Sequence, residues 1–235
     1  MTVRAALKIV GGIVAILLIA GLIAPYLTAD QYGKALQASL ERSLGRKVEI
    51  GNVRFSLFKG PGFSIGRVKI YEDPSIGIEP VAYVQDPGAM EVAPSLWSLL
   101  GGRFVIASIR LENASINLTK TGPAGEAGRW NFASLVNRSV LSAAPAIHVR
   151  NSRINFKFGD TKSVFYLTDT DLDISPPGAA ARGWSVYCSA KPARTDRPAQ
   201  RLGWFTVKGR WYTAPERVDL DIDLERTGLG ELTAL

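Results

Sequence analysis

The chain has 235 residues, one cysteine, one histidine and a formal net charge of +7. A single cysteine excludes an internal disulfide, and one cysteine with one histidine excludes a cluster of soft metal ligands. The length is sufficient for one domain with a real core, or for an open sheet that needs a partner.

Residues 9–27 form an apolar segment of nineteen residues without a charge. As a helix it would be about 28 Å long, close to the roughly 30 Å of a bilayer core. Arg4 and Lys8 precede it, and positive flanks stay cytoplasmic, so we assign residues 1–29 to a cytoplasmic stub and a transmembrane anchor. The alternative is a cleaved signal peptide, but the segment is longer than a typical signal-peptide core.

Residues 30–46 have the pattern of an amphipathic helix. Leu36, Leu40 and Leu44 recur every four residues and form one apolar stripe. Thr28 or Asp30 is a suitable N-cap, and Gly45 stands where a helix C-terminal glycine is expected. We expect this helix to pack its leucines onto the sheet that follows.

From Lys47 onward the hydrophobic period changes to two, which indicates strands with one apolar and one wetted face. The clearest case is residues 218–225, where four apolar residues alternate with four acids. A turn at Glu112–Asn113 is expected to separate two strands within residues 104–118. Short helices are expected at residues 94–100 and after Trp130. We therefore predict a mainly β fold with a few helices, and roughly ten to twelve mostly antiparallel strands in residues 47–235. Further strands are predicted at residues 48–50, 53–57, 65–70, 147–158, 164–174, 184–190 and 204–212.

Signals for catalysis are weak. Residues 62–66 match the G-x-S-x-G pattern of a hydrolase nucleophile elbow, but a strand-like segment follows Ser64 where the elbow requires a helix. The only histidine, His148, lies in an alternating strand context. Asp219, Asp221 and Asp223 share one strand face and suit a solvated strand edge better than a Ca²⁺ site. We expect no enzyme activity, no cofactor and no metal.

Basic residues are concentrated between residues 191 and 210. This excess favours either attraction to anionic headgroups or a solvated loop and strand face, and we prefer the second interpretation. Nucleic-acid binding would require the body to lie in the cytoplasm, so no nucleic-acid partner is expected. The basic residues are Lys191, Arg194, Arg197, Arg201, Lys208 and Arg210, against the single acid Asp196.

Several short motifs occur in a distinctive order after the anchor. They are Leu44-Gly45-Arg46, the residues 48–53 (VEIGNV), 60–65 (GPGFSI), 68–74 (VKIYEDP), 99–102 (LLGG) and 128–132 (GRWNF). Together they resemble the N-terminal region of bacterial AsmA-like proteins, over about residues 7–135. The resemblance implies an inner-membrane protein with a periplasmic body, whose curved, half-open sheet forms a groove that takes part in phospholipid transport and outer-membrane biogenesis. Members are usually much longer, which leaves open whether this chain is a fragment or a short member.

An apolar groove would shield acyl chains without fixing them in one place. The alternative is that the same residues form the core of an ordinary closed sandwich. We expect membrane phospholipids as partners, with envelope proteins as further possible partners, and a scaffold for outer-membrane protein assembly is the alternative function. The groove candidates are Phe104, Ile106, Ile116, Leu118, Val218, Leu220, Ile222 and Leu224.

Overall fold

The computed structural model describes residues 12, 32–56, 62–95, 98, 105–121, 128–131, 144–159, 161–177, 183–196, 203–213 and 216–226. Apart from Gly12, the predicted anchor at residues 9–27 lies outside the described residues, as does most of the two predicted short helices. Among the described residues, no helix is long and apolar enough to cross a membrane.

The helix α2 (Gly33–Leu44) confirms the leucine stripe. Leu36, Leu40 and Leu44 are buried, because their spacing of four keeps them on one side of the helix. The helix ends as predicted at Gly45, which adopts a φ of 62° and donates its backbone N–H to the carbonyl of Glu41 at 2.7 Å. The left-handed conformation at this position is one that glycine adopts without steric cost.

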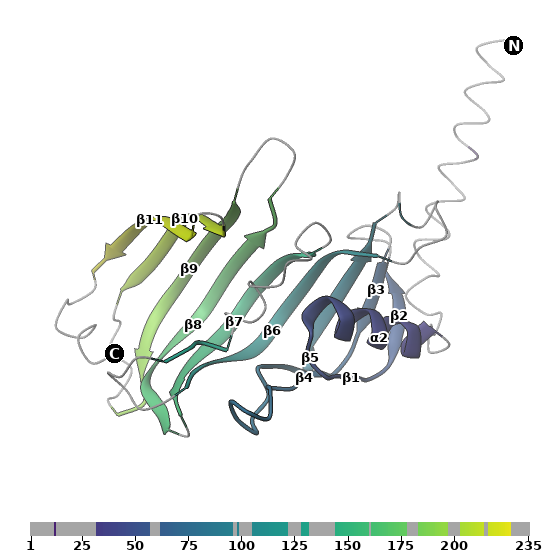
Figure 1. Ribbon diagram of the computed structural model, residues 1–235, viewed down its shortest axis with the longest axis horizontal. Coiled ribbons are helices and arrows are strands. Elements are labelled where there is room, and N and C mark those ends of the chain that lie inside the picture. The colour runs from purple at the N-terminus through teal and green to yellow at the C-terminus, as the bar shows by residue number, and fades with distance from the viewer. Residues whose placement is uncertain are drawn as a thin grey trace, which may run out of the picture.

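The body is one sheet of eleven described strands that does not close on itself (Figure 1). The N-terminal strands are short: β1 (Val48–Ile50), β2 (Val53–Ser56), β3 (Gly62–Ile65) and β4 (Val68–Ile70). The others are long: β5 (Ala82–Pro94), β6 (Ile106–Lys120), β7 (Ala146–Phe158), β8 (Thr161–Ser175), β9 (Trp184–Arg194), β10 (Trp204–Thr213) and β11 (Glu216–Glu225). The order is β1-β4-β5-β6-β7-β8-β9-β10-β11, with β2 and β3 joined to the sheet through β5.

The sheet is mostly antiparallel, as predicted, and among the described pairings only β6 and β7 are parallel. The prediction of a turn at Glu112–Asn113 was wrong, because β6 runs without interruption through both residues. Asn113 adopts a φ of 54°, so the extra residue forms a bulge within the strand. Asn151 on β7 and Asp169 on β8 have φ values of 47° and 48°, and the neighbouring strands therefore bulge at matching positions.

Two clusters of buried apolar side chains lie along the sheet. The first, called here the helix-covered core, joins the leucines of α2 to β1–β7, with Val48, Ile65, Met90 and Ile109 among its fully buried members. The second core lies further along the sheet, and no described helix packs on it. Its members are Ile154, Phe165, Leu167, Cys188, Ala190 and Val207.

Candidate functional site

The strand registers put the second core and β11 on one face of the sheet, called here the apolar face. Ile116 lies opposite Ile154, which lies opposite Leu167. Further along, Cys188 lies opposite Val207, and Val207 lies opposite Ile222. Because residues of one face recur every second position, the face continues from β6 to β11. On β11 it consists of Val218, Leu220, Ile222 and Leu224, called here the exposed stripe.

Burial changes abruptly at the last described strand. Val207 on β10 is 9% exposed, whereas its direct neighbour Ile222 on β11 is 56% exposed. Val218, Leu220 and Leu224 are 54%, 45% and 38% exposed. Four adjacent aliphatic side chains on one strand face form a contiguous apolar patch, of the kind that marks ligand grooves and interaction sites.

The predicted groove residues fall into different surroundings. Phe104 lies outside the described residues, and Ile106 is buried in the helix-covered core. Ile116 and Leu118 are half-buried and pack against the second core. Ile116 and Leu118 on β6 lie on the same apolar face as the exposed stripe on β11, although four strands lie between β6 and β11.

Sequence reasoning did not select most of the apolar face. Phe165, Leu167 and Val207 belong to it and follow the same two-residue alternation that identified β11. The alternation of apolar and polar residues would therefore have been enough to predict that these three residues lie on the apolar face. Cys188 also belongs to this face. Burial, and to a lesser degree the Asp171 carboxylate, raises the pKa of its thiol to about 11, so Cys188 acts as a small apolar residue rather than as a nucleophile.

The opposite face carries a row of charged and polar side chains in register across seven strands, called here the polar row. Its middle is an ion-pair group: Asp173 accepts from Arg150 Nη2 at 2.7 Å and lies 2.6 Å from His148 Nδ1. Burial raises the pKa of Asp173, but hydrogen bonds from His148 and Arg150 outweigh it and lower that pKa below its usual value. The members of the row are Glu91, Arg110, His148, Asp173, Tyr187, Lys208 and Asp221.

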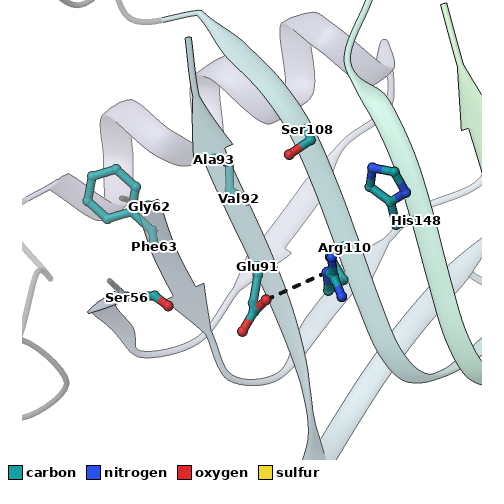
Figure 2. Close-up of a pocket in the computed structure, with 9 residues that line it drawn as sticks. All are labelled: Ser56, Gly62, Phe63, Glu91, Val92, Ala93, Ser108, Arg110 and His148. Atoms are coloured by element: carbon teal, nitrogen blue, oxygen red, sulfur yellow. Dashed lines mark ion pairs between the residues drawn. The ribbon is translucent and has the colours of Figure 1, made fainter. Parts of the chain in front are cut away.

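Figure 2 shows a pocket beside this row, lined by Ser56, Phe63, Glu91, Ser108, Arg110 and His148 among others. Arg110 Nε lies 3.8 Å from Glu91 Oε2 across neighbouring strands. Ser64, the serine of the hydrolase-like pattern, lies in the middle of β3 between β2 and β5. The strand β4 follows it, so residues 62–70 do not form the strand–turn–helix that a nucleophile elbow requires.

Part of the basic run forms local ion pairs and ring contacts, with Lys191 and Lys208 on the polar face and Arg194 opposite Phe165 of the second core. Lys191 Nζ lies 2.7 Å from Asp169 Oδ2, and Arg194 Nη2 lies 2.7 Å from Asp196 Oδ2. Lys208 stands over the ring of Tyr187 at 5.9 Å. Arg197 and Arg201 lie outside the described residues. Lys191 and Lys208 therefore lie among acidic and aromatic neighbours on the solvated face, whereas the side chain of Arg194 is only 10% exposed.

Three of the sequence motifs meet in one buried polar group, called here the Arg46 cluster. Arg46 Nη2 lies 3.3 Å from Glu72 Oε1 and donates to the carbonyl of Asn131 at 3.1 Å. Asn131 in turn donates to Glu72 Oε2 and, at 2.9 Å, to the carbonyl of Asn117. The side chains of Arg46 and Glu72 are only 6% and 2% exposed. The motifs around residues 46, 72 and 131 thus tie the end of α2 to β6.

Trp130, from the motif at residues 128–132, is half-buried in the structure. Its ring lies 6.3 Å from that of Phe156 and 5.9 Å from that of Phe158, both in edge-on contact. Phe132 of the same motif lies outside the described residues.

The described residues define a mainly β protein with one large, non-closed mixed sheet and an apolar face that reaches an exposed strand. No known family and no curated protein matches the sequence.

Proposed function

We propose that the chain is a single-pass inner-membrane protein whose periplasmic sheet shields lipid acyl chains on its apolar face. In this role it contributes to phospholipid transport and outer-membrane biogenesis, without catalysis and without a cofactor. The observation that carries the proposal is the exposed stripe on β11, which continues the apolar face of the second core.

The energetics suit such a role. Each buried methylene is worth about 0.8 kcal/mol, so a sixteen-carbon chain that leaves water gains about 12 kcal/mol gross. Aliphatic side chains make non-directional contacts, which allow an acyl chain to slide along the surface. The polar row lies on the other face, so a lipid tail beside the exposed stripe would not meet its charged groups.

Two features of the sequence support the location. The apolar segment at residues 9–27 has the length and the flanking charges of a membrane anchor with a cytoplasmic N-terminus. The motif order resembles that of AsmA-like proteins, and three of these motifs share the Arg46 cluster.

The test is lipid co-purification with the double variant Leu220→Asp/Ile222→Asp. Two carboxylates on the exposed stripe should abolish bound phospholipid, because burial of an unpaired charge against an acyl chain is unfavourable. The measurement is native mass spectrometry with lipid extraction after purification in mild detergent.

The matched control is Val164→Asp/Ser185→Asp, which adds two carboxylates to exposed positions on the opposite face of β8 and β9. It should keep wild-type lipid stoichiometry. If the folded Leu220→Asp/Ile222→Asp variant carries as much lipid as the control, the apolar face is not the lipid site.

A second function, a non-catalytic interaction module that assists outer-membrane protein assembly, is favoured by a different observation. β11 forms the end of the described sheet and pairs with β10 alone among the described strands. An open strand edge is a template for pairing with another chain.

A further inference from the structure

The two ends of the described sheet differ in how they are protected. β1 has three residues, whereas β11 has ten. All described side chains from Arg217 to Arg226 are exposed. Within the described part of the chain, the main-chain groups on the outer edge of β11 have no strand partner. Natural proteins usually shorten or cover such an edge, so a long exposed one indicates a pairing surface.

The two faces of β11 restrict what such a partner must carry. One face presents the exposed stripe, and the other presents Asp219, Asp221 and Asp223. β10 illustrates the complementary pattern on the inner edge: Lys208 lies opposite Asp221, Arg210 lies opposite Asp219, and apolar Val207 lies opposite Ile222. Opposite charges directly across two strands stabilise their pairing, and like charges destabilise it.

Symmetric pairing of β11 with β11 of a second copy does not satisfy this pattern. A two-fold antiparallel pairing of β11 centred on Asp221 would put Asp221 opposite its own copy and Asp219 opposite Asp223. A parallel, in-register pairing would also place each of these acids beside an acid. The antiparallel arrangement opposes acids at its three central positions and leaves only the Arg217–Glu225 pairs at its two ends favourable, and the parallel arrangement opposes like charges along the whole polar face.

We propose that the outer edge of β11, over residues 218–224, binds a polypeptide segment in which apolar residues alternate with lysine or arginine, and that this segment adds to the sheet as a further strand. The inference rests on the interaction-module function and deepens it by naming the chemistry of the partner. The added strand would place its apolar side chains beside the exposed stripe and its cations beside Asp219, Asp221 and Asp223.

The test uses the full chain in mild detergent and a fluorescent peptide with the sequence of residues 204–213, which already has this alternation. A second peptide carries glutamate in place of the lysine and the arginine. Fluorescence anisotropy should show about tenfold tighter binding of the basic peptide at low salt. Hydrogen exchange of residues 218–224 should slow when it binds, because strand addition protects the amides of the outer edge.

The variant Asp223→Lys supplies the charge reversal. Asp223 lies opposite the neutral Thr206, so the change introduces no like-charge pair with β10. It should lower the preference for the basic peptide several-fold. Equal affinity for the two peptides would overturn the charge rule and leave the edge as an unselective pairing surface. Absence of binding, or binding without protection of residues 218–224, would overturn strand addition. It would also remove the support for the interaction module. The lipid co-purification test does not depend on this result.

Discussion

At the scale of single residues, the Arg46 cluster joins a buried cation to a buried carboxylate through several hydrogen bonds. A buried guanidinium and a buried carboxylate are tolerated only when both are paired and hydrogen-bonded. Here Glu72 also accepts the backbone N–H of Asp73 at 2.9 Å, and Asp73 Oδ2 lies 3.3 Å from Arg46 Nη1. The cluster therefore fixes the segment after β4 against α2 and β6, and its residues act in the fold rather than in chemistry.

Arg46→Met should lower the free energy of unfolding by about 3–5 kcal/mol, because it leaves the Glu72 carboxylate buried without its cation. The measurement is urea unfolding followed by tryptophan fluorescence. The matched control is Lys191→Met, which breaks the exposed pair with Asp169 and should cost less than about 1 kcal/mol. Equal losses in the two variants would show that the Arg46 cluster contributes no more than a surface ion pair.

The Asp173 group should make stability depend on pH. Its pKa in the folded state lies below the usual value of 3.8, so the stabilisation is fully present above that value and is lost as the pH falls through the folded pKa. In thermal unfolding, Asp173→Asn should be less stable than the native sequence at pH 6, and the difference should shrink as the pH falls from about 5 to 3. A difference that stays constant over this range would show that ionisation of Asp173 plays no part.

At the scale of elements, the aligned bulges of β6, β7 and β8 set the shape of the sheet. Asn151 donates its side-chain amide to Asn113 Oδ1 at 2.7 Å, and its backbone N–H donates to Asp171 Oδ1 at 3.0 Å. Asparagine and aspartate tolerate the left-handed conformation better than other non-glycine residues. The three bulges therefore bend neighbouring strands together and keep the apolar face continuous.

Asn113→Val should destabilise the chain by about 1–2 kcal/mol or more, because a β-branched residue is strained at a φ of 54°. Asn113→Gly retains the backbone conformation and loses only the bond to Asn151, so its cost should be smaller. Thermal unfolding of the two variants measures the difference. If glycine costs as much as valine, the side-chain hydrogen bond, and not the backbone conformation, is what the bulge requires.

The elements that could be predicted are those whose pattern is local. Strands β7 to β11 were predicted within a few residues, because each alternates over most of its length, and α2 ended at Gly45 as expected. β6 was predicted as two strands, since Glu112–Asn113 has the composition of a turn and only the neighbouring strands decide that it is a bulge. β5 was not predicted, because Asp86-Pro87-Gly88 also has the composition of a turn.

The sequence predicted that the candidate site is an apolar face of a sheet, but not which of the apolar residues are exposed on that face. Alternation identified Leu220 and Ile222, but no local pattern tells an exposed apolar face from a buried one. Ile106 has the same alternation and is buried in the helix-covered core, because β5, β6 and α2 meet there. The Arg46 cluster was also beyond sequence reasoning, since Arg46 and Asn131 are 85 residues apart.

At the scale of the whole molecule, the proposed function requires the body to be anchored and exported. The full chain should stay in the membrane fraction after carbonate extraction, and alkaline phosphatase fused after Leu235 should be active only if the body is periplasmic. The intact mass of the purified chain separates the two interpretations of residues 9–27: a retained anchor preserves the full mass, and a cleaved signal peptide removes it. A cytoplasmic fusion would contradict the proposed location.

The order of the described strands from β7 to β11 has a mechanical consequence. Each of these strands pairs antiparallel with the next one along the chain, so a pull on residue 226 loads the β10–β11 hydrogen bonds one pair at a time. Such a sheet unzips at low force from the β11 end, strand by strand, while the part packed against α2 stays intact. The order in which the body loses its strands under tension is thus fixed by its topology, and the edge proposed to receive a partner is also the one that yields first.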